Sequence, residues 1–229
     1  MNERIGLRFD VGGLKGLIDS ETPARRGPAI YCYGIKRFLD IVLVLLALVP
    51  ALAILVPLMA IIALDGRSPI YVQKRLGRHG RVFHMFKLRS MVAGADQLLD
   101  NYLDRNEAAR VEWDLNQKLK SDPRITVFGS FIRKTSLDEL PQLFNVLLGQ
   151  MSIVGPRPML VEQRSLYPGA AYFEMRPGIT GFWQVSERNE TSFAERAGYD
   201  NAYFRQMSFG TDLRVIAQTV SVVMKATGH

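Results

Sequence analysis

The longest apolar stretch of the chain runs from Ile41 to Leu64 and contains no charged residue. As a helix it would reach ~36 Å, which is enough to cross the hydrocarbon core of a bilayer. Pro50 and Pro57 interrupt it, and proline inside a helix removes a hydrogen bond and favours a bend. The pattern therefore predicts a membrane element that bends at these two prolines.

Basic residues flank the apolar stretch on both sides, with Lys36 and Arg37 before it and Arg67, Lys74 and Arg75 after it. The positive-inside rule favours the cytoplasmic side for both flanks. A re-entrant helix that enters and leaves through one leaflet satisfies this rule. A proline-kinked span is the alternative that the sequence leaves open.

Shorter periodicities predict the remaining elements. Alternating polarity over Ile70 to Arg75 and Arg81 to Leu88 predicts a β-hairpin, and residues 92–120 carry the spacing of one or two helices. The apolar stripe within Asp212 to Lys225 predicts an amphipathic helix that packs on the core or lies on the membrane.

These elements predict a mostly helical α+β fold with a short β-hairpin, a re-entrant (monotopic) membrane helix and amphipathic interfacial helices. Residues 1–30 are rich in Gly, Arg and Pro without a sustained period, so we expect a loosely ordered tail there. Residues 31–66 form the expected membrane helix. Residues 67–229 form the expected cytoplasmic, membrane-docked catalytic domain.

Charge and composition narrow the functional classes. The 229 residues carry a formal net charge of +7, which implies an anionic partner: nucleic acid, an acidic lipid surface or a phosphorylated small molecule. A nucleic-acid binder is disfavoured because aromatic residues are not interleaved with the basic patches. Cys32 is the single cysteine and the three histidines are scattered, which argues against a disulfide framework, a zinc knuckle or histidine-based catalysis.

Two adjacent carboxylates are the strongest candidates for chemistry. Asp138 and Glu139 lie at the expected first turn of an apolar helix, which Pro141 also marks. Unpaired backbone N–H groups at a helix start favour a phosphate nearby. Ser136 and Glu139 also have the spacing of a capping box, in which Glu139 would only satisfy a backbone donor.

Basic and polar side chains supply candidate partners for an anion. Lys87 and Arg89 would share one face of a strand and hold phosphate oxygens together, although a basic rim on lipid headgroups is the alternative. Arg157 is framed by Pro156 and Pro158, which suits an oriented guanidinium. A later Gly/Pro-rich stretch, which reads otherwise as a long surface loop, offers candidate contacts to the sugar, nucleotide or lipid: Arg176, Gln184 and Arg188.

Taken together, these motifs resemble the bacterial sugar transferase family, the monotopic phosphoglycosyl transferases that act on a polyprenyl phosphate carrier. The small size and the insert between Met91 and Asp122 are most similar to undecaprenyl-phosphate galactose phosphotransferases of exopolysaccharide synthesis. The motifs that carry the resemblance are Lys36-Arg37-x-x-Asp40, Lys87-Leu-Arg-Ser-Met91, Arg133-x-x-Ser-Leu-Asp-Glu-Leu-Pro-Gln142, Asn145-Val-Leu-x-Gly149, Met151-Ser-Ile-Val-Gly-Pro-Arg-Pro158 and Arg176-Pro-Gly-Ile-Thr-Gly181-x-x-Gln184.

The resemblance implies transfer of a hexose 1-phosphate from a UDP-sugar to undecaprenyl phosphate, with Mg²⁺ and release of UMP. It is the first membrane step of exopolysaccharide or related glycan synthesis. By position, Asp138 would be the nucleophile that forms a covalent phospho-sugar intermediate, and Glu139 would bind Mg²⁺ with it or assist proton transfer. The charge that builds on the phosphoryl group would be neutralised by cations, for which the candidates are Lys87, Arg89, Arg133 and Arg157.

The resemblance also implies the setting of the reaction. The expected partners are a UDP-sugar, undecaprenyl phosphate and the cytoplasmic face of the bacterial inner membrane, without nucleic acid, and a homo-oligomer is compatible with the sequence. Galactose or glucose is the favoured hexose. One departure concerns the helix bend, because Ala53 occupies the position where the family usually has proline, and Pro50 and Pro57 bracket it.

Overall fold

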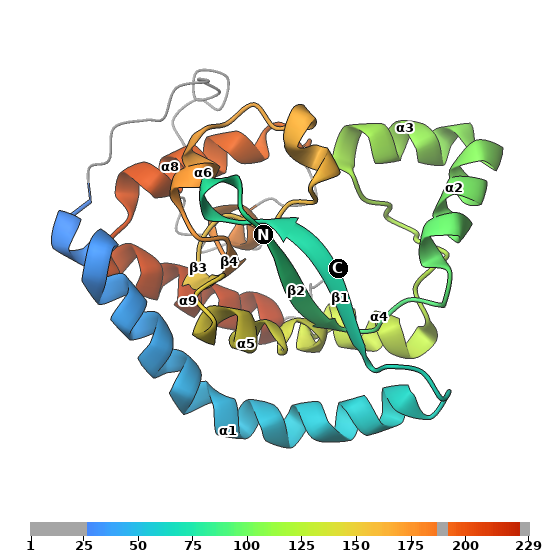
Figure 1. Cartoon of the computed structure of the whole chain (residues 1–229). Coiled ribbons are helices and arrows are strands. Elements are labelled where there is room, and N and C mark those ends of the chain that lie inside the picture. The colour runs from blue at the N-terminus through green and yellow to red at the C-terminus, as the bar shows by residue number, and fades with distance from the viewer. Residues whose placement is uncertain (1–26, 187–191, 225–229) are drawn as a thin grey trace, which may run out of the picture.

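A long helix and a mixed α+β unit make up the computed structural model (Figure 1), which describes residues 27–186 and 192–224. Nearly all of the expected tail, residues 1–30, lies outside these ranges. The predicted α+β composition is confirmed, since the described residues are mostly helical, with a short antiparallel hairpin and one long apolar helix. The helices are α1 (Lys36–Ala63), α2 (Ala95–Arg105), α3 (Glu107–Asn116), α4 (Val127–Lys134), α5 (Gln142–Leu147), α6 (Ala171–Glu174), α7 (Phe182–Val185), α8 (Arg196–Gln206) and α9 (Phe209–Met224).

Helix α1 follows one side of the molecule, preceded by a π-helical turn over Tyr31–Ile35. It is one continuous helix through Pro50 and Pro57, and it bends along its length, as the sequence predicts (Figure 1). By length and composition it can cross a membrane. Its outer face exposes large apolar side chains, among them Leu46, Val49 and Val56.

The inner face of α1 packs against the rest of the protein. Val44 is fully buried in one apolar cluster together with Phe83, Met85, Val146 and Met151. Farther along the helix, Leu55, Leu58 and Ile62 pack with Leu88 and Ile132. The burial of these side chains stabilises the contact between α1 and the α+β unit along most of the helix.

The hairpin is formed by β1 (Ile70–Leu76) and β2 (Val82–Leu88), with Ile70 opposite Leu88 and Leu76 opposite Val82. His79 and Gly80 have positive φ angles in the turn between them. The alternation that predicts the hairpin is borne out, since Phe83 and Met85 on one face of β2 are buried. The predicted helices within residues 92–120 and near the C-terminal end are confirmed as α2, α3 and α9.

A second, two-stranded parallel pair positions the loop that carries Arg157. Strands β3 (Ser152–Val154) and β4 (Gly178–Thr180) pair with Ser152 opposite Gly178. Their backbones approach so closely after β3 that a Cβ atom at Gly178 would lie 2.1 Å from the backbone nitrogen of Gly155. Only glycine fits here, so the Gly155–Pro158 loop is fixed against β4.

Candidate active site

The acidic pair lies in a short 3₁₀ turn, Leu137–Glu139, between α4 and α5. The prediction that it occupies the first turn of the apolar helix is therefore wrong, because α5 begins only at Gln142, after Pro141. Helix α4 ends at Lys134, and Ser136 then adopts a left-handed backbone conformation with φ 57°. The chain turns at this position, and Asp138 is buried.

The capping-box interpretation is also wrong. The side chain of Ser136 makes no capping hydrogen bond, and the N–H of Ser136, which Glu139 would have satisfied, donates instead to the carbonyl of Arg133 over 3.0 Å. A capping serine needs an extended backbone, which the positive φ of Ser136 excludes. The Glu139 carboxylate pairs instead with side chains from other elements.

Lys87 links the two carboxylates. Its Nζ lies 3.1 Å from Oε1 of Glu139 and 3.7 Å from Oδ2 of Asp138. Nη1 of Arg157 lies 3.7 Å from the same Glu139 oxygen. These groups come from β2, from the turn before α5 and from the loop after β3, so the fold brings together residues that are far apart in the sequence.

The environment of Asp138 is dry and positively charged. Asp138 is only 6% exposed. This burial raises the pKa of its carboxyl above the ordinary value. The positive charges of Lys87, Arg133 and Arg157 lower the pKa and oppose that shift. Burial lowers the pKa of the Arg133 guanidinium, and Asp138 opposes that shift. Nε of Arg133 donates to Oγ of Ser90 over 2.8 Å, which orients the side chain.

Two other predicted site residues have structural partners elsewhere. Arg89 pairs with Asp65 at the end of α1, over 2.6 Å, and also donates to the carbonyl of Ile62. Nε of Arg176 donates to the carbonyl of Gly149 over 2.9 Å. The structure therefore does not bring Arg89 or Arg176 to the acidic pair.

Gln184 and Arg188 complete the predicted set. Gln184 is buried at α7, and its Nε2 donates to the carbonyl of Ile179 over 3.4 Å. Its Oε1 is buried and has no hydrogen-bond partner among the residues that the structure describes. Arg188 lies outside the described residues.

Sequence reasoning missed two side chains that line the same cavity as Lys87, Glu139 and Arg157, namely Arg75 and Gln142. Arg75 donates through Nη1 to the carbonyl of Pro158 over 2.9 Å, so it braces the loop that carries Arg157. The sequence signal that could have identified Arg75 is its position on the predicted strand that pairs with the strand of Lys87. Gln142 is 2% exposed. Only its place in the motif that ends at Gln142 could have indicated that it belongs to the site.

The donor set of this site fits Mg²⁺ shared with a substrate. Within residues 27–186 and 192–224 no group of three or more carboxylate, histidine or cysteine side chains could hold a metal ion. Asp138 and Glu139 supply two adjacent carboxylates, and Mg²⁺ is commonly bound by one or two carboxylates together with substrate phosphates. The arrangement suits an ion that arrives with a phosphorylated substrate.

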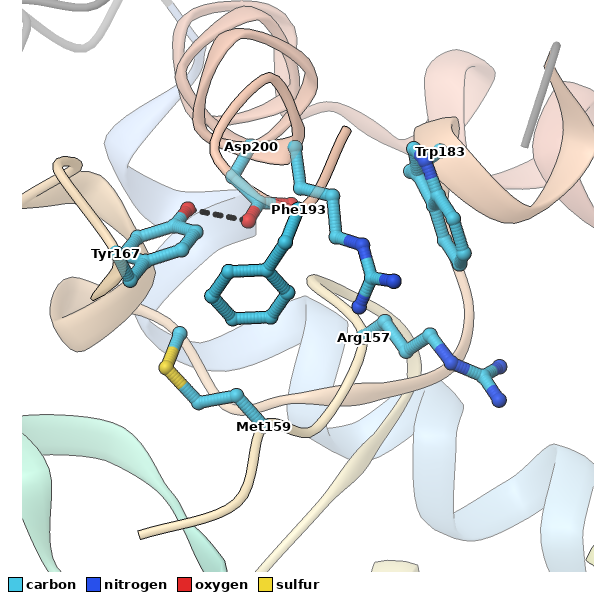
Figure 2. Close-up of a pocket in the computed structure, with 7 residues that line it drawn as sticks. Arg157, Met159, Tyr167, Trp183, Phe193 and Asp200 are labelled. Atoms are coloured by element: carbon cyan, nitrogen blue, oxygen red, sulfur yellow. Dashed lines mark hydrogen bonds between the residues drawn. The ribbon is translucent and has the colours of Figure 1, made fainter. Parts of the chain in front are cut away.

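Arg157 also lies over the indole ring of Trp183, and both residues line a second pocket (Figure 2). A buried carboxylate next to a half-buried one, beside converging lysine and arginine side chains, defines a phosphate-handling enzyme core, here joined to a long apolar helix. The chain belongs to the bacterial sugar transferase family, whose model matches residues 31–226.

Curated relatives agree with this membership. The chain is 45% identical to the UDP-galactose-lipid carrier transferase of Erwinia amylovora over 196 residues, which cover 85% of this chain and 41% of that protein. It is 42% identical to the undecaprenyl-phosphate galactose phosphotransferase of Salmonella typhimurium, with the same two coverages. The exopolysaccharide production protein ExoY of Sinorhizobium fredii is 41% identical, covering 84% of this chain and 87% of that protein. The chain thus spans about two fifths of the length of the first two relatives and most of the third.

Proposed function

We propose that this protein transfers a hexose 1-phosphate from a UDP-sugar to undecaprenyl phosphate and releases UMP, as the first membrane step of exopolysaccharide or related glycan synthesis. The buried Asp138 carboxylate beside Glu139, with Lys87 in contact with both, carries the proposal. The names of the relatives support the substrates, and two of them specify galactose.

In the first step, an oxygen of the Asp138 carboxylate attacks the β-phosphorus of the UDP-sugar. The bond between this phosphorus and the bridging oxygen breaks, and UMP leaves with the bonding electron pair. The product is an acyl phosphate on Asp138 that carries the sugar. In the second step, an oxygen of the lipid phosphate attacks the same phosphorus and frees the carboxylate.

Both steps bring two anions together, so the surrounding cations lower the barrier. Lys87 lies within ion-pair distance of Asp138, and Arg133 and Arg157 add positive charge around it. Glu139 holds Lys87 and Arg157 at this position. Mg²⁺, when bound by Asp138 and Glu139, would supply further charge neutralisation at the phosphates.

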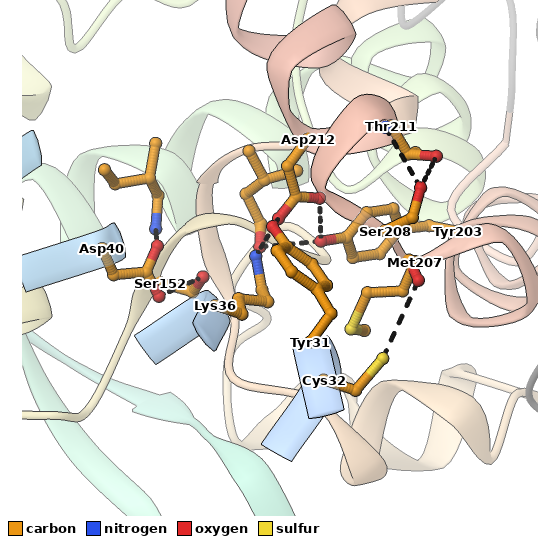
Figure 3. A network of polar contacts seen from close by, with 12 residues as sticks. Tyr31, Cys32, Lys36, Asp40, Ser152, Tyr203, Met207, Ser208, Thr211 and Asp212 are labelled. Atoms are coloured by element: carbon orange, nitrogen blue, oxygen red, sulfur yellow. Dashed lines mark hydrogen bonds and ion pairs between the residues drawn. The ribbon is translucent and has the colours of Figure 1, made fainter. Parts of the chain in front are cut away.

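We also propose that α1 is re-entrant, with both ends at the cytoplasmic face of the bacterial inner membrane. At its start, Lys36 and Tyr31 bind Asp212, and Asp40 accepts hydrogen bonds from Ser152 and Ile153 (Figure 3). At its end, Asp65 pairs with Arg89. A helix that is tied at both ends to one unit favours two ends on the same side of the bilayer, and its basic flanks favour the cytoplasmic side.

Enzyme mixed with a UDP-sugar alone should gain the mass of one hexose phosphate and release an equal amount of UMP. The lipid is needed only to discharge this intermediate, so the full reaction should follow ping-pong kinetics. Intact-protein mass spectrometry after rapid quenching, followed by peptide mapping, checks the adduct and its place on Asp138. A panel of UDP-sugars identifies the hexose. No adduct, with UMP release only when both substrates are present, would establish direct transfer instead.

Single cysteines at Ile5 and Arg67, in a Cys32→Ser background, should both resist an impermeant thiol reagent in intact cells and both react after lysis. The re-entrant arrangement puts both positions in the cytoplasm. Labelling is read by the mass shift of the protein on a gel. A cysteine at Ile5 that reacts in intact cells would show that α1 spans the bilayer as a kinked helix, and the chemistry of Asp138 would stand unchanged.

A further inference from the structure

Asn145, near the middle of α5, is a fully buried polar residue that bonds to the strand carrying Lys87. Its exposed fraction is 0%. Its Oδ1 accepts a hydrogen bond from the backbone N–H of Phe86 over 3.0 Å, and its Nδ2 donates to the carbonyl of His84 over 2.7 Å. The same Nδ2 donates to Oε1 of Gln150 over 2.6 Å. The amide oxygen and both amide hydrogens of Asn145 are therefore used.

The bonds from Asn145 to β2 lie on the edge of the strand that β1 leaves uncovered. In the part of the chain that the structure describes, β1 is the one strand that pairs with β2. Backbone groups of alternate strand residues point to the same edge, so the carbonyl of His84 and the N–H of Phe86 lie together there. A free edge leaves such groups without strand partners. The carboxamide of Asn145 supplies both partners and joins α5 to β2 at two defined backbone atoms.

Apolar packing brings α5 and β2 together but does not fix their alignment. Val146 of α5 packs with Phe83 and Met85 of β2, and such contacts are non-directional. A strand that slips by one residue turns its side chains to the opposite face. Lys87 follows Phe86 directly, so the hydrogen bond to the N–H of Phe86 constrains where the lysine lies.

The carboxylates that Lys87 meets are attached to the same helix as Asn145. The two residues that link the acidic turn to α5 have helical φ and ψ angles. The turn with Asp138 and Glu139 therefore continues directly into the helix with Asn145. Nζ of Lys87 lies 3.7 Å from Asp138 and 3.1 Å from Glu139. The alignment of β2 against α5 is thus also the alignment of Lys87 against the acidic pair.

We propose that Asn145 is a positioning residue for phosphoryl transfer, which aligns β2 with α5 and thereby holds the ammonium of Lys87 against Asp138 and Glu139. The inference rests on the proposed function, in which this ammonium offsets the charge of the attacking carboxylate and of the phosphate. Asn145 acts through Lys87 and touches no substrate, because its side chain is fully buried. A shift of a catalytic group by ~1 Å can lower a rate by ~10²-fold.

A double-mutant cycle on turnover tests the proposal, with the full-length protein in detergent, its preferred UDP-sugar and polyprenyl phosphate. Asn145→Ala should lower kcat by about 10- to 100-fold, with a smaller change in KM, because a misplaced charge acts on the transition state. In a Lys87→Gln background the same substitution should change kcat by no more than about twofold, since the group that Asn145 positions is gone.

Val146→Ala is the matched control for a loss of packing. It truncates a fully buried side chain at the next position of α5, in contact with the same strand, but removes no directional bond. It should lower the melting temperature and leave kcat within a factor of a few. Equal losses of kcat from Asn145→Ala in both backgrounds would show a merely structural role and overturn the proposal. A normal kcat in folded Asn145→Ala would overturn it as well.

Thermal melting identifies an unfolded Asn145→Ala variant, and Asn145→Asp then takes its place in the same cycle. This substitution keeps the size of the side chain and the acceptor for the N–H of Phe86, but a carboxylate cannot donate to the carbonyl of His84. The same two outcomes decide: a loss that disappears in the Lys87→Gln background supports the proposal, and an equal loss in both backgrounds overturns it.

Hydrogen exchange, read by mass spectrometry with single-residue fragmentation, gives a result that is independent of activity. The N–H of Phe86 should be protected in the unaltered protein and should exchange about tenfold faster in Asn145→Ala. Rapid exchange at Phe86 in the unaltered protein would overturn the proposal. Absence of UMP release with every UDP-sugar would instead reject the proposed function, and exchange at Phe86 would still report whether Asn145 holds the strand.

Discussion

Asp138→Asn should reduce UMP release by about 10⁴-fold or more, because an amide oxygen cannot replace the carboxylate as nucleophile. The variant should fold normally. Burial raises the pKa of Asp138, which means that the charged form is disfavoured in the folded protein, and a neutral side chain of the same shape removes that cost. Lys87 keeps Glu139 as a partner.

The measurements are UMP release with saturating UDP-sugar, intact mass after quenching and thermal melting in detergent. Asp114→Asn makes the same chemical change at an exposed position of α3 and should behave as the unaltered protein in all three. An Asp138→Asn variant that releases UMP at the normal rate would exclude Asp138 as the nucleophile and with it the covalent mechanism.

Lys87→Gln should reduce turnover by about 10² to 10³-fold, the range found when one preorganised hydrogen-bond donor to a transition state is removed. Lys87 is the cation within ion-pair distance of both carboxylates, and its side chain is only 19% exposed. Without it, attack of one anion on another loses its nearest compensating charge, and the effect should fall on kcat more than on KM.

Lys74→Gln is the matched control on the same hairpin, since Lys74 is exposed to solvent. It should leave turnover within a factor of a few. Vesicle flotation with anionic lipids completes the test, because a basic rim on the membrane would predict the opposite pattern. If Lys87→Gln reduced vesicle binding and left turnover per bound enzyme unchanged, Lys87 would belong to the lipid-facing surface.

Hydrophobic patterns along the sequence correctly predicted the β1–β2 hairpin and helix α9. The alternation in the hairpin and the apolar stripe in α9 each record which face is buried, so both were predictable. The presence of Lys87, Arg133 and Arg157 around Asp138 was expected only from the resemblance to the family, because β2, α4 and the loop after β3 meet through tertiary packing. The pattern of residues along the sequence does not predict that these three segments lie close together.

The predictions that failed did so for identifiable physical reasons. Lys87 and Arg89 would share a face only while the strand continues, but β2 ends at Leu88, so Arg89 turns to Asp65 instead. The Ser136–Glu139 spacing predicted a capping box only if Ser136 began a helix, whereas its positive φ places it in a turn.

The packing of α1 has a consequence for how the protein is made. Val44 and Leu55 share apolar clusters with Phe83, Met85 and Leu88 of the strand that leads to Lys87. The hairpin therefore completes its core only when α1 is already beside it, so under the proposed membrane placement the insertion of α1 and the folding of the catalytic unit are coupled events. A protein that begins after Ala63, and therefore lacks α1, would expose those hairpin side chains to water and would tend to aggregate. Handling this enzyme in solution requires a detergent or lipid that covers the exposed face of α1, because the opposite face of the same helix packs against β2, the strand that carries Lys87.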